Sequence, residues 1–449
     1  MMNVIVLLAV LLCCPAMMQA QESVSLLSPG RSWNYVRINT DGTRDNVSLK
    51  LVGVSEYDGR PAYTLAYCTP ESTKERCLLQ EGASPDEICL LRVGEDNIRE
   101  RLSAFSTQIS YGSSSYEWWL DGSSQSVALP GTLRQRDEVE VSGVRRLRSY
   151  FFREGSEEPV DIWVSGIGSW RDGILPSCRI ADIVGSDSLE FESCADGDGH
   201  ILFSKADFQT PRQKDVYRPL LEDHKVWYCA SFYPSGVVAG GTPQVAWYYQ
   251  YFTEGDTIVS GRQCHKVFGS NHLHNGETAY LCAMYEQDGK VWCIERGSAE
   301  SCLLYDFTMG YDEEISVEFT SLGLPFRTAK KIGDSYFTDD AGEWHAHIYQ
   351  NMNLVEGIGP DSGLLWPMAD DNTTGGFREV VLCTVNGDVI WDRTLATGLS
   401  RGSVVGIHTP FQSQVETGIY DLQGRKVSNA DLQLPRGVYI QNGRKFVIK

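Results

Sequence analysis

The sequence predicts an all-β protein with two tandem antiparallel β-meander repeats, each closed as a sandwich or barrel, and a small C-terminal β-hairpin module. Three observations predict this fold class. Short β-rich runs recur between Gly, Asp and Ser clusters, dipeptides typical of hairpin turns lie between such runs, and one pattern of landmarks occurs twice in the 449 residues. No segment shows a long period of 3.6, which would be the signal of an amphipathic helix.

The first element is an apolar leader. The run Val4 to Leu12 precedes the small residue Ala20, a pattern typical of a secretory signal peptide over residues 1–20. A lipoprotein signal ending at Cys13 or Cys14 is the second interpretation. The run is shorter than the roughly 20 residues that cross a bilayer, and no later stretch is apolar enough, so we expect an exported protein that is not transmembrane.

An internal duplication is the most informative feature of the chain. Gly166-Ile167-Gly168 recurs as Gly357-Ile358-Gly359, a shift of 191 residues. Other landmarks recur with similar shifts: Trp33 with Trp227, Cys89 with Cys282, and Cys194 with Cys383. The shift drifts by only a few residues, as loop insertions would cause, so the sequence contains two copies of one unit.

The duplication divides the chain into six predicted parts. They are a signal peptide (1–20), a first β-rich repeat (21–208), a linker (209–222), a second β-rich repeat (223–395), a second linker (396–415) and a C-terminal sorting-type β module (416–449). Each repeat has about 190 residues, which is long enough to bury its own core.

A hairpin signal stands at Asp288-Gly289 in the second repeat. This dipeptide favours a type I′ turn because Gly accepts a positive φ. Pairing across the turn sets two pairs opposite each other: Tyr285 with Trp292, and Ala283 with Ile294. We expect this apolar face to be buried, and the other face, which mixes Cys282 and Met284 with charged residues, to be only partly covered.

The cysteines predict a mostly reduced protein. Removal of the leader leaves eleven of the 13 cysteines, and an odd number leaves at least one thiol unpaired in a monomer. No C-x-x-C pair suggests zinc or a redox site, so we expect small buried thiols with one or two bridges. Two closely spaced pairs are the hypotheses for bridges: Cys68 with Cys77, and Cys293 with Cys302.

The tail predicts a separate β module. Gly424 allows a tight turn between two β-rich runs. Farther on, Asn442-Gly443 is a strong hairpin signal that sets two pairs opposite each other: Tyr439 with Phe446, and Val438 with Val447.

These blocks closely resemble, in their order and in ending at a terminal Lys, the C-terminal sorting domain of proteins exported by the type IX secretion system of Bacteroidota. The resemblance implies that the type IX export machinery is a partner, which reads the tail after the leader has brought the chain to the periplasm. The body would then be secreted or attached to the outer cell surface. By this resemblance the signal residues are Asp421, Gly424, Arg425, Pro435, Gly437, Tyr439, Gly443 and Lys449.

The charge argues against nucleic acid or an anionic membrane surface as the main partner. Asp plus Glu total 59 and Lys plus Arg total 39, giving a formal net charge of −20. Phosphate binding needs clustered cations, and this chain has an excess of carboxylates.

One pair of histidines has the spacing of a metal site. His345 and His347 are two residues apart, so a strand would point both imidazoles to one face, with Glu343 and Asp340 nearby as oxygen ligands. A solvated strand face is the alternative that we favour, and we predict no metal and no cofactor. Weaker metal or calcium signals are His272 with His274, the loop 196–199 and the loop 370–372.

Aromatic side chains suggest a ligand platform. The candidates are Trp118, Trp119, Trp247 and Tyr249, because exposed rings on a rigid sheet bind sugars or peptides. Adjacent residues on a strand face opposite sides, so at least one ring of each neighbouring pair should lie in the core.

The leading hypothesis for function is a non-catalytic, exported, surface-associated β-protein that binds glycan or protein ligands. Two similar units can raise avidity without new contacts. The alternative is a secreted hydrolase, similar to a glycosidase, that uses a pair of carboxylates. No nucleophile elbow, zinc helix, P-loop or dinucleotide motif occurs in the sequence.

Overall fold

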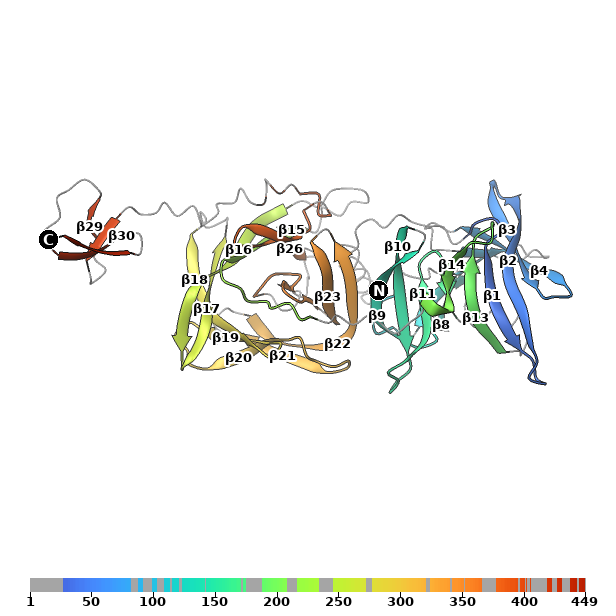
Figure 1. Ribbon diagram of the computed structural model, residues 1–449, viewed down its shortest axis with the longest axis horizontal. Helices are drawn as coiled ribbons and strands as arrows, with labels where there is room; N and C mark the ends of the chain where they lie inside the picture. The colour runs from blue at the N-terminus through green and yellow to red at the C-terminus, as the bar shows by residue number, and fades with distance from the viewer. Residues whose placement is uncertain are drawn as a thin grey trace.

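The computed structural model shows an all-β protein, which confirms the predicted fold class (Figure 1). Among the described residues the regular structure other than strands is a 3-10 turn at Lys205–Asp207. The structure describes residues 27–81, 88–91, 99–102, 109–113, 115–120, 123–141, 143–170, 173–174, 188–207, 216–233, 245–271, 277–319, 324–339, 341–350, 352–365, 377–394, 396–399, 401, 404, 418–421, 426–429, 437–441 and 444–448. The predicted signal peptide lies outside these residues.

The first repeat contributes a ten-stranded antiparallel sheet. Its order is β14-β13-β1-β2-β3-β4-β5-β6-β7-β8. The strands are β1 (Ser32–Ile38), β2 (Arg44–Tyr57), β3 (Arg60–Cys68), β4 (Thr73–Glu81), β5 (Ile88–Leu91), β6 (Arg99–Leu102), β7 (Ser115–Leu120), β8 (Ser123–Ala128), β13 (Ser188–Ala195) and β14 (Ile201–Ser204).

The second repeat contributes an eight-stranded antiparallel sheet that curls into a half-barrel (Figure 1). Its order is β20-β19-β18-β17-β16-β15-β26-β27. The strands are β15 (Lys225–Phe232), β16 (Val245–Val259), β17 (Arg262–Asn271), β18 (Thr278–Gln287), β19 (Lys290–Glu295), β20 (Ser301–Asp306), β26 (Phe377–Val385) and β27 (Asp388–Asp392).

A third sheet is shared by both repeats. Its order is β12-β11-β10-β9-β22-β23-β24-β25, and β21 pairs with β22 beside this path. The strands are β9 (Thr132–Val141), β10 (Val144–Phe152), β11 (Pro159–Val164), β12 (Gly168–Ser169), β21 (Glu314–Phe319), β22 (Leu324–Asp339), β23 (Gly342–Tyr349), β24 (Met352–Val355) and β25 (Gly359–Pro360). The two copies are therefore not separate sheet systems, because β9 and β22 join them by a short parallel pairing.

The two copies use opposite faces of this shared sheet. Asp334 pairs with Gln135 across the junction, so their side chains share a face. Arg136, the neighbour of Gln135, points to the other face, where it is buried and donates to the Ser149 hydroxyl of the first repeat. Asp334 belongs to the interior of the second repeat, so the sheet is a wall between two cores.

The duplication appears as the same topology and the same contacts in both copies. The order β14-β13-β1-β2-β3-β4 corresponds to β27-β26-β15-β16-β17-β18. The indole of Trp33 donates to the carbonyl of Ile167 at 2.6 Å, and that of Trp227 donates to the carbonyl of Ile358 at 2.7 Å. Each tryptophan also lies opposite a buried cysteine of the neighbouring strand: Cys194 in the first copy and Cys383 in the second.

Part of the predicted linker 209–222 packs into the second repeat. Leu220 is completely buried, and the backbone N–H of Leu221 donates to Glu286 in β18 at 2.9 Å. A Cβ added at Gly359 would lie 3.2 Å from the Leu220 side chain, so the recurring glycine loop packs against this segment. Leu220 and Leu221 are thus packed residues of the second unit.

The hairpin predicted at Asp288-Gly289 is confirmed. Both residues have positive φ, at 54° and 71°, and Tyr285 pairs with Trp292 as expected. The apolar face is buried as expected, because Tyr285, Ala283 and Ile294 form a small core cluster of their own. The expectation for the other face was wrong: Cys282 and Met284 are buried in the main core, because the half-barrel curls around them.

The tail contains a four-stranded sheet of its own, with the order β29-β28-β30-β31. The strands are β28 (Gly418–Asp421), β29 (Lys426–Asn429), β30 (Gly437–Gln441) and β31 (Arg444–Ile448). The predicted hairpin register is confirmed, because Tyr439 pairs with Phe446 and Val438 pairs with Val447. None of these described strands pairs with a strand of the body.

Candidate functional site

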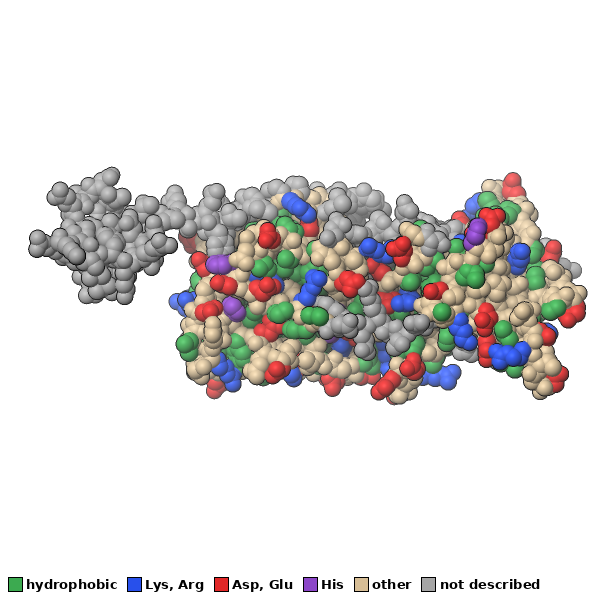
Figure 2. Space-filling view, in the orientation of Figure 1, with side chains coloured by type: hydrophobic (Ala, Val, Ile, Leu, Met, Phe, Trp, Pro, Cys, Tyr) green, Lys and Arg blue, Asp and Glu red, His purple; other side chains and the backbone are tan. Residues whose placement is uncertain are grey.

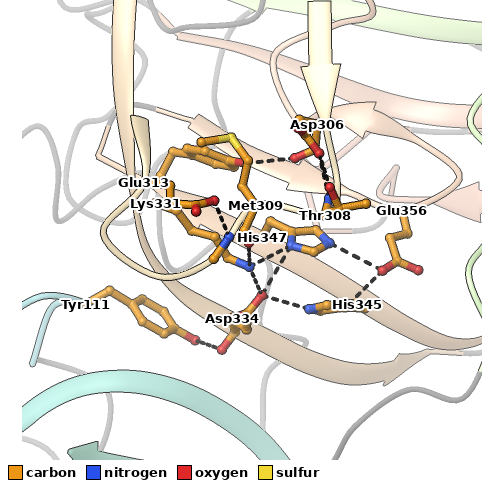
Figure 3. Close-up of polar contacts among 12 residues, drawn as sticks. Tyr111, Asp306, Thr308, Met309, Glu313, Lys331, Asp334, His345, His347 and Glu356 are labelled. Atoms are coloured by element: carbon orange, nitrogen blue, oxygen red, sulfur yellow. Dashed lines mark hydrogen bonds and ion pairs between the residues drawn. The ribbon is translucent and has the colours of Figure 1, made fainter. Parts of the chain in front are cut away.

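A buried network of charged side chains lies inside the second repeat (Figure 3). Its members come from three places in the shared sheet: Lys331 and Asp334 from β22, His345 and His347 from β23, and Glu356 from the turn after β24. His347 and Lys331 are 3% and 5% exposed. Burying charges is costly unless they are paired and hydrogen-bonded, so a cluster of this kind needs a physical explanation.

Strand periodicity and one bulge bring these groups together. His345 and His347 point to the same face, as their spacing predicts, and their ring centroids are 4.1 Å apart. Asp334 lies directly opposite His347. Lys331 is three residues from Asp334 and would face the other side of a regular strand, but a bulge between Lys331 and Gly333 turns it to the same face.

The polar contacts form a closed ring. The Lys331 ammonium lies 2.9 Å from Asp334 Oδ1 and 3.0 Å from His347 Nδ1. Glu356 Oε1 lies 3.3 Å from His347 Nε2 and 2.7 Å from His345 Nδ1, and His345 Nε2 lies 2.9 Å from Asp334 Oδ1. His347 Nδ1 also lies 3.3 Å from Asp334 Oδ1, so every member contacts at least two other members.

Donor and acceptor rules fix the protons of His345. Both of its nitrogens face carboxylate oxygens, which only accept, so both must donate and the ring is an imidazolium. His347 Nδ1 faces both the Lys331 ammonium at 3.0 Å and Asp334 Oδ1 at 3.3 Å, so the same rules do not fix its proton. Lys331 and His345 are the two cations that face the carboxylates of Asp334 and Glu356.

The pKa shifts agree with this assignment. Burial lowers the pKa of His345, but its hydrogen bonds with Asp334 and Glu356 outweigh burial and raise the pKa above its ordinary value. Burial raises the pKa of Asp334, but its hydrogen bonds with His345 and His347 and the charge of Lys331 hold it well below its usual range.

Aromatic rings enclose the network. Tyr336 stacks on His345 with a centroid distance of 4.2 Å, and Phe307 meets His347 edge-on at 5.6 Å. The Asp334 side chain is 25% exposed, more than that of any other member. The network thus approaches solvent mainly at Asp334.

The ligand atoms of Asp334, His345 and His347 lie close enough to hold a metal ion. The fit is poor, because the Lys331 ammonium already contacts both Asp334 Oδ1 and His347 Nδ1 and also donates to the Met309 carbonyl at 3.0 Å. A lysine in this position supplies the positive charge that a metal would bring. The chemistry of the set is that of a structural ion network.

The first copy has no such network at the corresponding positions. The backbone N–H of Glu356 donates to the His345 carbonyl, and the N–H of Ser165 donates to the Leu147 carbonyl in the same way. By this register the counterparts of His345-Ala346-His347 are residues 147–149.

A second polar cluster in the same repeat contains the half-buried carboxyl group of Asp361 and the buried one of Glu379. Asp361 accepts from the Asn353 amide at 2.8 Å, and Glu379 accepts from Arg393 Nε at 3.3 Å. Burial raises the pKa of Asp361 to about 6 and that of Glu379 to about 7. Such groups can hold a proton near neutral pH, which is the property of a general acid.

The aromatic platform is not formed as predicted at Tyr249. This side chain is buried and donates to the Ser362 carbonyl at 2.8 Å, and Trp247 on the same strand face packs partly buried against the main core. Trp118 and Trp119 lie in β7, and their side chains are outside the described part of the structure.

The remaining predicted site residues are placed as follows. Asp421 lies in β28 opposite Tyr439 in β30, and Gly437 begins β30. The other signal residues lie outside the described residues: Gly424, Arg425, Pro435, Gly443 and Lys449. His272, His274, Asp340 and the loop 370–372 lie outside them too. The loop 196–199 is a hairpin turn in which Asp196 accepts from backbone N–H groups.

Sequence reasoning expected Glu343 and Asp340 as the oxygen ligands beside the histidines. Glu343 is exposed, and the carboxylates that contact the histidines are those of Asp334 and Glu356. The hairpin between β22 and β23 was the signal that could have identified Asp334, since pairing Asp339 with Gly342 sets Asp334 opposite His347.

Comparison of the chain with known protein families, with curated protein sequences and with solved structures found no match. Within the described residues, no helix combines the length and the apolar character needed to cross a bilayer.

Proposed function

We propose that the protein is an exported, non-catalytic β-protein of a Bacteroidota-type bacterium, secreted or held at the outer cell surface by a type IX sorting tail. The observation that carries this proposal is the tail. Its described strands form a four-stranded sheet that pairs with no strand of the body. A self-contained module at the end of a chain suits an address that export machinery reads and removes.

The buried network supports the non-catalytic part of the proposal. Lys331 and His345 face the carboxylates of Asp334 and Glu356, and each of the four contacts at least two other members of the ring. A catalytic group needs room to exchange protons with a substrate, whereas these groups bond to one another. They are better suited to joining β22, β23 and the turn after β24.

The surface supports a protein or glycan ligand over nucleic acid. The net charge is −20, and on the face shown in Figure 2 acidic and basic side chains are interspersed over the described surface. Phosphate binding would need a basic stripe.

Fractionation of cells that own type IX machinery tests the proposal. The full chain is compared with a chain that ends at residue 415, both detected through the body. We expect the full chain in the medium or at the cell surface and the shortened chain in the periplasm. A matched control replaces Ser428 with Ala, a small change in the same module. Equal distribution of the full and shortened chains would overturn the proposal.

A secreted hydrolase is the second candidate, and Asp361 with Glu379 is the observation that favours it. Both carboxyl groups have raised pKa values. Glu190, the first-copy position nearest to Glu379 by the shift of Cys194 to Cys383, instead forms a surface ion pair with Arg44. The test is turnover of chromogenic glycosides by the wild type and by Glu379→Gln. Turnover that the substitution abolishes would support the hydrolase, and no turnover by the wild type would reject it for these substrates.

A further inference from the structure

Three cysteines lie in a row across neighbouring strands of the half-barrel. Cys282 is in β18, Cys293 in β19 and Cys302 in β20. Cys282 and Cys293 are buried, and Cys302 is half-buried. Neither the charged network nor the tail uses these thiols.

The register places Cys293 directly opposite Cys302. Directly opposite residues of an antiparallel pair share a face and have Cα atoms about 4.5 or 5.5 Å apart, and both spacings lie within the range that a disulfide bridges. The thiol of Cys302 lies over its partner's strand, 3.5 Å from the Cys293 carbonyl oxygen. The register therefore allows a bridge, which forms when both thiols leave their present hydrogen bonds and turn toward each other.

The other candidate pair lacks this geometry. Cys77 lies opposite Leu65, and Cys68 lies opposite Thr73, four residues from Cys77 along β4. Four residues of strand span about 13 Å, which is too far for a disulfide. The hypothesis of a Cys68–Cys77 bridge was therefore wrong, and this pair serves as an internal control.

Cys282 is a competitor for Cys293. Their thiols are hydrogen-bonded, but Cys282 lies opposite Glu295, so it is diagonal to Cys293 and not opposite it. Diagonal neighbours have Cα atoms about 7–8 Å apart, beyond the usual span of a disulfide. The direct pair is favoured for this reason.

We propose that Cys293 and Cys302 form a disulfide bond that fastens β20, the terminal strand of the half-barrel sheet, to β19. For the protein in its own cell this rests on the proposed export, since disulfides persist in oxidising compartments. The oxidant is a small-molecule or protein disulfide. The Cys302 thiolate attacks it, forming a mixed disulfide and releasing one thiol. The Cys293 thiolate then attacks the Cys302 sulfur and releases the second thiol.

The order of attack follows from exposure. Cys302 is half-buried and can meet the oxidant, whereas Cys293 is fully buried and reacts in the second, intramolecular step. Burial raises the pKa of both thiols, so the thiolate fraction is small at neutral pH and oxidation should be faster in mildly alkaline buffer.

The test uses the purified, reduced full chain incubated with oxidised glutathione and digested without reduction. We expect one cross-linked pair of peptides containing Cys293 and Cys302, lighter than the sum of the reduced peptides by two hydrogens. Cys302→Ser should abolish this product, and Cys77→Ser should leave its yield unchanged. A Cys282–Cys293 bridge, stable glutathionylation of Cys302 alone, or two thiols that remain open to alkylation would overturn the proposal.

This assay separates the bridge from the proposed export. Formation of the Cys293–Cys302 bridge in the purified chain supports the geometric inference wherever the protein resides. The same peptide mapping, applied to chain recovered from the medium or cell surface, tests whether the bridge forms in the cell. We expect most of these molecules to contain it. Reduced thiols there, together with proven surface location, would overturn the cellular part of the proposal.

Discussion

Lys331 decides the chemistry of the buried network. Its ammonium contacts Asp334, His347 and the Met309 carbonyl, so the histidine and carboxylate atoms that a metal ion would bind already contact a cation. The sequence made the histidine pair visible through its spacing. It did not reveal Lys331, because a bulge changes the face to which this residue points.

Replacing Lys331 tests its role as the cation of the network. Lys331→Met leaves the buried carboxylate of Asp334 without one of its two balancing charges, so we expect a loss of about 3–5 kcal/mol in the free energy of unfolding. Urea unfolding provides the measurement. Lys330→Met is the matched control: Lys330 pairs with Asp312 at the surface, and its loss should matter much less. Equal effects of the two substitutions would contradict the account.

His345 should make stability depend on pH in a defined direction. Its pKa in the folded protein is raised above the ordinary value of 6.5, so its contribution is complete below pH 6.5 and is lost as the pH rises through the folded pKa. Asp334 makes stability depend on pH in the acidic range. Its pKa in the folded protein is depressed below the ordinary value of 3.8, so its contribution to stability is complete above pH 3.8 and is lost as the pH falls through the folded pKa.

The measurement is urea unfolding of the wild type and of His345→Gln across the pH range. The difference between them should be largest between about pH 4 and 6.5 and should shrink in alkaline buffer. His200→Gln is the control, because His200 is 78% exposed and its pairing with Asp196 is screened by solvent. A difference that grows with rising pH would contradict the proton assignment.

The glycine loops are the element that repeats most closely. In each copy the turn is closed by a backbone hydrogen bond, from Ile167 to the Val164 carbonyl and from Ile358 to the Val355 carbonyl. Gly168 and Gly359 have φ values of 106° and 93°, a region that L side chains rarely adopt. The motif recurs because only glycine fits a loop that must present its carbonyl to the core tryptophan.

Alanine substitutions in the two loops should differ in cost. A Cβ at Gly168 would meet the Gly173 carbonyl oxygen at 2.3 Å, whereas one at Gly359 would meet the flexible Leu220 side chain at 3.2 Å. We expect each substitution to cost at least the roughly 1–3 kcal/mol of a strained φ, and Gly168→Ala to cost more than Gly359→Ala because its Cβ meets backbone that cannot move aside. Gly42→Ala measures the cost of a positive φ without a steric clash, since Gly42 has φ 82° and a Cβ there would have no neighbour within 4 Å. Thermal unfolding would contradict this ranking if Gly42→Ala were the most damaging.

The sequence predicted the strands and hairpins better than it predicted which residues pack against them. The pairs of the hairpin at Asp288-Gly289 and of the tail hairpin could be derived, because turn chemistry fixes local register. The sequence could not show which face of the hairpin at Asp288-Gly289 meets the main core, since that depends on how the whole sheet curls. The burial of Leu220 was missed too, because this apolar residue lies in a charged stretch that was predicted to be a linker.

The two copies meet as one body through a shared wall. Strands β9 and β22 run in parallel there, and each copy fills the side of the wall that faces its own sheet. The junction is tight: Tyr111 of the first copy donates to the Asp334 carbonyl at 3.2 Å, and Arg145 donates to the Thr338 carbonyl at 2.6 Å. A duplication visible in the sequence did not predict this parallel contact, because nothing local specifies it.

Widening the junction should uncouple the two copies. A Cβ at Gly333 would lie 2.3 Å from the Tyr111 ring and 2.5 Å from the Arg134 carbonyl oxygen, so Gly333→Ala forces the strands apart. We expect calorimetry to show one unfolding transition for the wild type and two for Gly333→Ala. Gly53→Ala is the control, because its Cβ would meet only Thr64 at 3.7 Å. A single transition for Gly333→Ala, shifted no more than that of Gly53→Ala, would contradict the shared wall.

The central claim about function is that the last 34 residues, 416–449, carry the address of the protein. The most direct measurement appends them to an unrelated periplasmic reporter in cells that own type IX machinery, followed by protease added outside intact cells. The account predicts that the reporter becomes accessible to the protease or is released into the medium. A reporter that stays protected, while the same reporter with an established sorting tail is exposed, would contradict the account.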